Sequence, residues 1–379
     1  MLADALKIAV EAPTVEHSPK LALLGMPAAN LVELFETLDE KPYRARQVMK
    51  WLYQRHVTDF GAMTDLSAEL RKQLAEISTA ELPDVLEREH SADGTRKWLL
   101  NVGAGQAVET VFIPEPNRGT LCISSQAGCA LDCAFCATGH QGFNRNLSSA
   151  EILGQVVLAA HELDPIPITN VVFMGMGEPL ANYKNVLPVV QLLIDDQAFG
   201  LSRRRVTIST AGIVPRLNEL ADDCNVALAV SLHAPTDDLR DRLVPINKVH
   251  PIAELLDACW HYAQRIASRQ ITFEYVLLDG VNDSVAQARQ LVRLLKGRPA
   301  KVNLIPFNAF PASEFRCSTP TAIDAFWRVL RDSGLIATIR RPRGDDIAAA
   351  CGQLAGRVLD RQRVRLGARV TRGVGASSP

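Results

Sequence analysis

Three cysteines stand close together in the first half of the chain, at Cys129, Cys133 and Cys136. Their C-x3-C-x2-C spacing puts three soft thiolates on one short loop, directly after the apolar run 121–124. A structural zinc site usually takes four ligands from two C-x2-C pairs, so three thiolates suit an iron–sulfur cluster better. Three protein ligands on a cubane cluster leave one iron free to bind a substrate. The alternative is that these cysteines are small, buried hydrophobic side chains.

Candidate binding residues follow several later apolar runs. Gly177 and Glu178 come after the run 170–174; a glycine lets the backbone approach a ligand, and a carboxylate can pair with an ammonium group. A tight turn that ends a strand is the alternative at this position. Other candidates, each of which could instead cap a loop, end the later runs: Ser209, Ser231, Leu232, His233 and Asn308.

The elements that must position these residues are six short apolar runs, at 121–124, 170–174, 206–209, 226–232, 271–278 and 302–307. Amphipathic helical stretches lie between most of the runs, and the clearest begins at a capping box formed by Ser148 and Glu151. Strands that alternate with helices predict an α/β fold with a parallel sheet, here a partial (β/α)6 TIM-like barrel. In such a barrel the chemistry sits at the carboxyl ends of the strands, where the candidate residues lie.

The sequence pattern changes along the chain and divides it into five predicted parts. Apolar residues at three- and four-residue spacing in 21–82 are typical of a small helical bundle, and strand-like runs around the polar stretch 90–95 predict a hairpin. The parts are a flexible tail (1–20), a helical accessory domain that binds RNA (21–94), a β-hairpin linker (95–114), the barrel core (115–349), and a C-terminal segment with a cysteine loop, a basic helix and a flexible tail (350–379).

The composition is that of an ordinary globular protein, because 47% of the 379 residues are hydrophobic and 22% are charged. No signal peptide or bilayer-length apolar stretch occurs, and eight cysteines are too few for a disulfide scaffold, so we expect a cytoplasmic protein. Taken alone, the net charge of −1 argues against a polyanion partner, but this total averages a basic end of the chain against an acidic remainder. Residues 340–379 hold nine Arg and three Asp, a net of +6, which favours RNA binding.

The cysteine triplet resembles the signature of the radical S-adenosylmethionine (SAM) superfamily. This resemblance implies a 4Fe–4S cluster on Cys129, Cys133 and Cys136, with SAM chelated to the open iron. An electron from the cluster then cleaves SAM to a 5′-deoxyadenosyl radical. Gly177 and Glu178 resemble the superfamily motif that holds the amino end of SAM. The remaining candidate SAM contacts are Ser209, Ser231, Leu232, His233 and Asn308.

A closer resemblance is to the RlmN-type dual-specificity RNA methyltransferases. It rests on the segments Leu121–Cys129 (LCISSQAGC) and Gly142–Leu147 (GFNRNL) and on Cys351, and it extends over almost the whole chain. It implies a radical SAM barrel with a small N-terminal helical domain. It also implies methylation of C2 of one adenosine in 23S rRNA and of the adenosine next to the anticodon in some tRNAs. Two SAM molecules per turnover and an electron donor protein are implied as well.

The same resemblance implies roles for two cysteines outside the cluster. One SAM methylates Cys351, and a radical made from the second removes a hydrogen from that methyl group. The methylene radical adds to C2 of adenine, an electron-poor carbon, and forms a covalent protein–RNA adduct. Cys122 resolves the adduct and ends in a transient disulfide with Cys351, while Glu109 accepts a proton. Considered without the resemblance, both cysteines could be core residues and Glu109 an outward-facing carboxylate.

The other cysteines match no catalytic position, and we interpret Cys224, Cys259 and Cys317 as structural. Basic surface should provide the RNA contacts, because cations neutralise phosphates and aromatic rings stack on unpaired bases. The segment 41–55 has five cations, no acid and interleaved aromatic residues, and 203–205 and 340–343 are further basic clusters. A solvated helix face is the alternative for the first segment. We expect 23S rRNA and tRNA as partners, and no membrane.

Two other functions share parts of this pattern. A sister activity methylates C8 of the same rRNA adenosine with the same cluster and the same two catalytic cysteines, so the motifs discriminate poorly between C2 and C8. A non-enzymatic iron–sulfur regulator that binds RNA would need the cluster, but it gives no reason for Cys122, Glu178 or Cys351. We therefore predict an adenosine-C2 methyltransferase.

Overall fold

The computed structural model describes residues 20–266, 270–341 and 343–358. The flexible tail predicted before residue 20 and the basic helix and flexible tail predicted after residue 358 lie outside these described residues. No helix among the described residues is long and apolar enough to cross a membrane.

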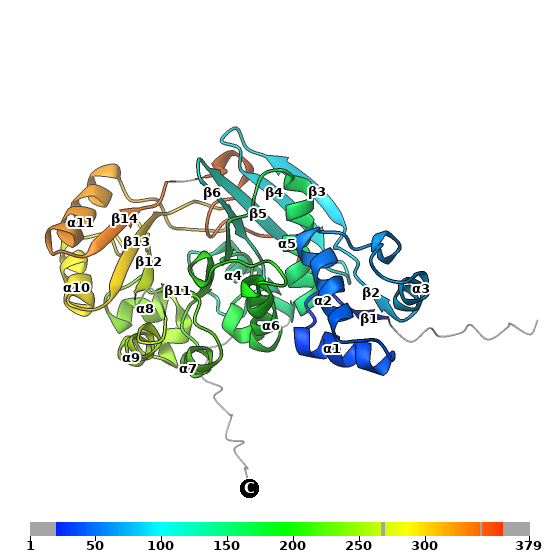
Figure 1. Ribbon diagram of the computed structural model, residues 1–379. Coiled ribbons are helices and arrows are strands. Elements are labelled where there is room, and N and C mark those ends of the chain that lie inside the picture. The colour runs from blue at the N-terminus through cyan, green and yellow to red at the C-terminus, as the bar shows by residue number, and fades with distance from the viewer. Residues whose placement is uncertain (1–19, 267–269, 342, 359–379) are drawn as a thin grey trace, which may run out of the picture.

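One ten-stranded sheet runs through the described part of the chain (Figure 1), in the order β14-β13-β12-β11-β10-β9-β6-β5-β4-β3. Its parallel strands are β6 (Arg118–Cys122), β9 (Asn170–Phe173), β10 (Val206–Thr210), β11 (Ala227–Ser231), β12 (Ile271–Leu277), β13 (Ala300–Pro306) and β14 (Ile336–Ile339). The first six coincide with the six predicted runs. The strand β14 was not predicted, because it is short and largely exposed. The predicted fold class, a partial TIM-like α/β barrel with an N-terminal helical domain, is confirmed.

Helices connect the parallel strands and bury one apolar face against the sheet. They are α5 (Ser149–Leu163), α6 (Tyr183–Ile194), α7 (Val214–Asp223), α8 (Asp237–Leu243), α9 (Ile252–Ala263), α10 (Val285–Leu295) and α11 (Pro320–Asp332). The capping box predicted for the first of these helices is present, since the Ser148 hydroxyl accepts from the Glu151 N–H and the Glu151 carboxylate accepts from the Ser148 N–H. Two backbone donors that the helix start leaves unpaired are thereby satisfied.

Three antiparallel strands extend the same sheet, β3 (Val85–His90), β4 (Arg96–Asn101) and β5 (Ala107–Glu115), and we name them the linker strands. The strand β3 falls within the predicted helical domain (21–94), so the strands begin before the predicted linker (95–114). The polar stretch 90–95 forms the turn between β3 and β4, while β4 and β5 form a second hairpin. Sequence reasoning did not predict that these strands continue the barrel sheet through the β5–β6 pair. As a result, the linker is rigidly attached to the first barrel strand.

The N-terminal unit contains the helices α1 (Ala28–Thr37), α2 (Tyr43–Met49) and α3 (Ala68–Ile77), and it lies at the end of the molecule opposite α10 and α11 (Figure 1). A short parallel pair, β1 (Leu21–Ala22) with β2 (Ser78–Thr79), closes this unit. Ser67 caps α3 by accepting from the Leu70 N–H. Tyr53, an aromatic residue of the basic segment 41–55, is buried, and its hydroxyl accepts from the Gly25 N–H. It is therefore unavailable to stack on RNA bases.

A small hairpin, β7 (Gln126–Gly128) with β8 (Phe143–Asn146), encloses the cysteine loop and the short helix α4 (Ala137–Gln141). At the other end of the chain, residues 344–357, which we name the Cys351 loop, return to the linker. The backbones of Ala107 and Arg357 exchange two hydrogen bonds of 2.8 Å there. Residues more than 240 positions apart in the sequence thus meet at one edge of the barrel.

Candidate active site

One cavity at the carboxyl ends of the barrel strands brings most of the predicted site residues together. Its walls come from the cysteine loop, from the ends of five successive strands, β9 to β13, and from the Cys351 loop. The predicted residues that line it are Cys129, Cys133, Cys136, Gly177, Glu178, Ser209, Ser231, His233 and Cys351. This is the location that the strand-end rule predicts for a barrel.

The three cysteines of the loop share this cavity as free thiols. Burial raises the pKa of Cys129, Cys133 and Cys136, and for Cys133 the neighbouring thiols raise it further. In the described part of the chain, no three His, Cys, Asp or Glu side chains converge as ligands of one metal ion would. The thiols are soft donors on one wall of a cavity, a donor set that fits a multi-iron cluster.

The cysteine loop is held by its own backbone and by the barrel. The Cys136 N–H donates to the Cys133 carbonyl at 3.1 Å, and the Ala134 N–H donates to the Leu243 carbonyl at 3.1 Å. On the far side, the Ala137 N–H donates to the carbonyl of Gly352 at 2.8 Å. The loop is thus fixed between α8 and the Cys351 loop.

Glu178 is one of two buried carboxylates that line the cavity, the other being Glu274, and the close packing around it explains why a glycine precedes it. Its two carboxylate oxygens accept from the backbone N–H groups of Leu180 and Ala211 at 3.1 and 2.8 Å. Burial raises the pKa of Glu178 to about 7, although these hydrogen bonds oppose the shift. Gly177 has a φ of +97°, and a Cβ there would lie 2.5 Å from the Gln126 side chain, so only glycine fits.

His233 lies in the cavity with a defined ring orientation. Its Nδ1 accepts a 3.0 Å hydrogen bond from the Val276 N–H, and the Phe135 ring of the cysteine loop packs edge-on against it at 4.4 Å. Burial and, to a smaller extent, the cation of Arg240 together lower the pKa of His233 to about 3. The ring is therefore neutral and presents its Nε2–H side away from Val276.

Arg240 is a structural residue of the site that the sequence did not predict. It is fully buried, and its guanidinium donates to the carbonyls of Ala211, Ser231 and Leu232 at 2.6, 3.0 and 3.2 Å. These carbonyls end the strands β10 and β11, so one side chain holds two strand ends in place. In the sequence, Arg240 sits in a run of charged residues that has the pattern of a solvated helix face.

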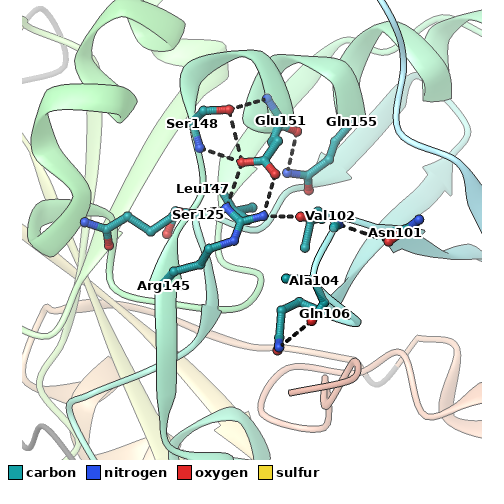
Figure 2. A network of polar contacts seen from close by, with 12 residues as sticks. Asn101, Val102, Ala104, Gln106, Ser125, Arg145, Leu147, Ser148, Glu151 and Gln155 are labelled. Atoms are coloured by element: carbon teal, nitrogen blue, oxygen red, sulfur yellow. Dashed lines mark hydrogen bonds and ion pairs between the residues drawn. The ribbon is translucent and has the colours of Figure 1, made fainter. Parts of the chain in front are cut away.

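A second polar network supports the hairpin β7–β8 from outside the cavity (Figure 2). Arg145 forms an ion pair with Glu151 at 2.6 Å and donates to the carbonyl of Val102, which joins the hairpin to α5 and to the linker. Nearby, the buried Gln155 accepts from the Ser124 N–H and donates to the Ser124 carbonyl, both at 2.8 Å. The network fixes the chain between β6 and the cysteine loop.

Two of the predicted SAM contacts, Leu232 and Asn308, do not line the main cavity. Leu232 is fully buried in the core and is absent from the cavity lining; only its backbone takes part, through Arg240. Asn308 lines a smaller neighbouring cavity, and its side-chain amide donates to the carbonyl of Cys351 at 3.1 Å. Asn308 therefore holds the Cys351 loop in this structure.

The two predicted catalytic cysteines come from opposite ends of the chain to the same region. Cys351 lines the main cavity, while Cys122 is buried at the end of β6. The pKa of Cys122 is raised to about 12, chiefly by burial and in part by the neighbouring Cys351, whereas Arg340 opposes the shift. Arg340 lines both cavities beside Cys351 and so lies inside the barrel.

Glu109 lies outside the main cavity, on β5. One carboxylate oxygen accepts from the Ala355 N–H at 2.8 Å, and the other is 3.4 Å from Nζ of Lys97. Its own backbone carbonyl accepts from the Ser124 hydroxyl at 2.6 Å. The side chain thus contacts the Cys351 loop, and it is not the outward-facing carboxylate that a strand pattern alone suggests.

The basic clusters differ in their surroundings. Residues 203–205 are exposed, whereas the cations at 340, 341 and 343 line a third cavity, together with Arg118 and Lys301. In the segment 41–55, the Arg55 guanidinium stacks on the Trp51 ring at 4.0 Å, and the Trp51 indole N–H donates to Asp65 at 2.6 Å.

Comparisons with known proteins agree with this site. The N-terminal domain of ribosomal RNA large subunit methyltransferases matches residues 21–80, and the radical SAM superfamily matches residues 123–292. A crystal structure of a radical SAM methyltransferase from Sphaerobacter thermophilus has a TM-score of 0.84 and 44% identity, covering 89% of this chain and 100% of that one. Fold and site together define a radical SAM protein.

Two curated relatives identify the family more narrowly. The dual-specificity RNA methyltransferase RlmN of Marinobacter nauticus is 55% identical over 350 residues, which cover 91% of this chain and 95% of the relative. The RlmN of Alkalilimnicola ehrlichii is 57% identical over 343 residues, covering 90% and 95%. The chain belongs to the RlmN family of dual-specificity RNA methyltransferases, and the resemblance predicted from the motifs is confirmed.

Proposed function

We propose that this protein methylates C2 of one adenosine in 23S rRNA and of the adenosine next to the anticodon in tRNAs. The reaction uses two SAM molecules per turnover and a methyl group carried on Cys351. The observation that carries the proposal is that Cys351, 215 positions after Cys136, lines one cavity with the three loop cysteines and Glu178. A protein that only held a cluster would have no need of a fourth thiol there.

Different residues of the cavity would bind the cluster and SAM. Cys129, Cys133 and Cys136 would hold a 4Fe–4S cluster, which supplies an electron and, with SAM, a carbon radical when bound. Glu178 would hold the ammonium of SAM, because a buried carboxylate with backbone donors already in place is oriented and lacks a cation. Ser209, Ser231 and His233 would contact the rest of SAM from the neighbouring strand ends.

Residues outside the cluster would carry the methyl transfer. Cys351 accepts a methyl group from the first SAM and, after hydrogen abstraction, forms the bond to C2 of adenine. A base then takes the proton from C2, and Glu109 is the carboxylate nearest the Cys351 loop in the contacts described above. The radical adduct must also give up one electron, for which the oxidised cluster would be the acceptor when bound. The Cys122 thiolate then attacks the Cys351 sulfur, so that a disulfide forms as the sulfur–carbon bond breaks. The methylene carbon left on C2 takes up a proton and becomes the methyl group of the released RNA.

The RNA would bind on the basic surfaces. The third cavity, with Arg118, Lys301 and Arg341 in its wall, shares Arg340 with the main cavity and suits a phosphate backbone. An electron donor protein must supply the reducing electron, and the setting would be the cytoplasm. Reduction of the Cys122–Cys351 disulfide would complete the cycle.

Anaerobic reconstitution with iron, sulfide, SAM, a chemical reductant and RNA fragments tests the proposal. Nucleosides from 23S rRNA and tRNA fragments should contain 2-methyladenosine by mass spectrometry. 8-Methyladenosine without 2-methyladenosine would assign the sister activity instead. A reconstituted cluster with bound RNA and no methylated nucleoside would favour an iron–sulfur regulator and overturn the proposal.

A further inference from the structure

Lys97 is a buried lysine on the linker strands that no step above uses. It lies on β4 with only 7% of its side chain exposed. Glu89 on β3 is its direct cross-strand partner, whereas Glu109 on β5 pairs with Leu99 and is therefore its diagonal neighbour. Nζ lies 2.6 Å from a Glu89 carboxylate oxygen and 3.4 Å from a Glu109 carboxylate oxygen.

The same ammonium group also holds the Cys351 loop. Nζ donates to the carbonyl of Ile347 at 2.5 Å, four residues before Cys351. Four residues after Cys351, the Ala355 N–H donates to the other carboxylate oxygen of Glu109 at 2.8 Å. Lys97 and Glu109 thus hold the loop on both flanks of the methyl-carrying cysteine.

Stability alone does not account for this arrangement. Buried ion pairs often contribute little to folding, because desolvation of the charges offsets their attraction. Here Lys97 has two carboxylates and one carbonyl as acceptors, and its contact with Glu109 is independent of the loop. When the loop moves and the Ala355 bond breaks, Lys97 still fixes one oxygen of Glu109 while the other becomes free to accept a proton.

We propose that Lys97 is a positioning residue that couples Glu109 to the Cys351 loop. Its contact with Ile347 helps to hold the docked loop, and its contact with Glu109 keeps the carboxylate in place once the loop has moved toward the RNA. This inference rests on the proposed role of Glu109 as the proton acceptor. It extends that role by making the acceptor's availability depend on the position of the loop.

The test compares variants of the reconstituted holoenzyme. Lys97→Met removes the ammonium group and keeps an unbranched side chain, whereas Lys97→Arg keeps a cation that can still reach carboxylates. We expect Lys97→Met to lower kcat for RNA methylation about tenfold or more, with KM for RNA changed less than about threefold. The reason is that the variant still binds RNA but no longer holds the Glu109 carboxylate in position. Lys97→Arg should recover part of the loss. Glu89→Gln, the matched control, keeps the contact between Lys97 and Glu109 and should change kcat less than about threefold.

A second measurement reports on the loop directly. Hydrogen exchange of peptides that cover residues 344–358 should be faster in Lys97→Met than in the parent, at equal iron content. If Lys97→Met does not fold, Lys97→Gln replaces it in both measurements. A folded variant with parental kcat and parental exchange would overturn the proposal, and so would a loss that Lys97→Arg does not relieve at all.

A double-mutant cycle separates the role of Lys97 from that of Glu109. Combined with Glu109→Gln, Lys97→Met should cause little further loss of kcat, because both act on one step. Fully multiplicative losses would show that Lys97 acts elsewhere and would contradict the coupling. If Glu109→Gln alone keeps parental turnover, Glu109 is not the proton acceptor, and that part of the proposed function fails, whereas hydrogen exchange still reports whether Lys97 holds the loop.

Discussion

The cysteine loop and the Cys351 loop place thiols in one cavity by opposite means. Cys129, Cys133 and Cys136 lie within eight consecutive residues, and local hydrogen bonds together with the Leu243 carbonyl hold their loop. Cys122 and Cys351 are 229 positions apart and meet only because the chain returns to the linker strands. The first group can bind a ligand from one segment, whereas the second must be assembled by the whole fold.

This difference suits the chemistry expected of each group. Ligands of a cluster must stay fixed, and a short loop with its own backbone bonds is a rigid support. A thiol that carries a methyl group between SAM and RNA must move. The Cys351 loop is held by separate hydrogen bonds to Asn308, Lys97 and Glu109, and each of these can break and re-form. Rigidity and mobility are thus divided between two segments.

The largest expected effect comes from the cysteine loop. Cys133→Ala should abolish the cluster and lower RNA methylation by about 10³-fold or more, because three cysteines act as one unit. Iron and sulfide analysis together with nucleoside mass spectrometry provide the measurement. Cys317→Ser, at an exposed cysteine, is the control and should retain both properties. A full complement of iron in Cys133→Ala would mean that this cysteine is not a ligand.

The corresponding substitution in the Cys351 loop should abolish methyl transfer without loss of the cluster. Cys351→Ala should keep the iron content and SAM binding of the parent, since its side chain is not among the proposed ligands. RNA methylation should still fall by about 10³-fold, because no other thiol of the cavity can carry the methyl group. Continued turnover of Cys351→Ala would refute the methyl-carrier role and break the contrast between the two regions.

The partner thiol should act later in the reaction. Cys122→Ala should let the adduct form and prevent its release, so that RNA stays covalently bound to the protein and turnover falls about 100-fold or more. Denaturing gel electrophoresis of reactions with labelled RNA detects the trapped species. Cys259→Ala removes another fully buried thiol and should give no adduct. If both variants behave alike, Cys122 has no resolving role.

Adduct release should depend on pH because the thiolate is the reactive form of Cys122. Burial raises the pKa of Cys122 to about 12, so the thiol is protonated at neutral pH and the thiolate fraction increases about tenfold per pH unit below that value. Release in a single turnover should therefore accelerate from about pH 7 to about pH 9, while SAM cleavage in the same series reports any general effect. Release that does not change with pH would require another base at Cys122.

The smallest effect is expected where only one hydrogen bond holds the loop. Asn308→Ala removes the donor to the Cys351 carbonyl at 3.1 Å, a loss of about 1 kcal/mol that corresponds to about fivefold in kcat. Steady-state RNA methylation is the measurement, and iron content should stay unchanged. A loss as large as that of Cys351→Ala would mean that Asn308 binds SAM directly, as its strand-end position alone suggests.

The sequence predicted the local features well. Six strands of the barrel, the capping box at Ser148 and the cysteine loop follow from patterns within about fifteen residues, and each is present in the structure. The strand-end rule also placed Glu178, Ser209 and His233 in one cavity. The side chain of Leu232 lies outside this cavity, because the rule gives the position of a residue along a strand and not the direction of its side chain.

The residues that the sequence could not predict are buried polar groups with distant partners. Arg240, Gln155 and Lys97 look like solvated polar residues in the sequence, since they have partners as far as 29, 31 and 250 positions away. Strand β14 was missed for a similar reason: it is exposed, and its pairing with β13 defines it better than its composition does.

The sequence by itself determined the chemistry of this protein, because ligand type and spacing fix what a short loop can bind, and such information is local. The tertiary structure decided which distant groups act on that chemistry. Only the return of the chain to the linker brings Cys351 into the cavity and Glu109 and Lys97 against its loop. Long-range contacts depend on the packing of the complete barrel, and no short stretch of sequence contains that information.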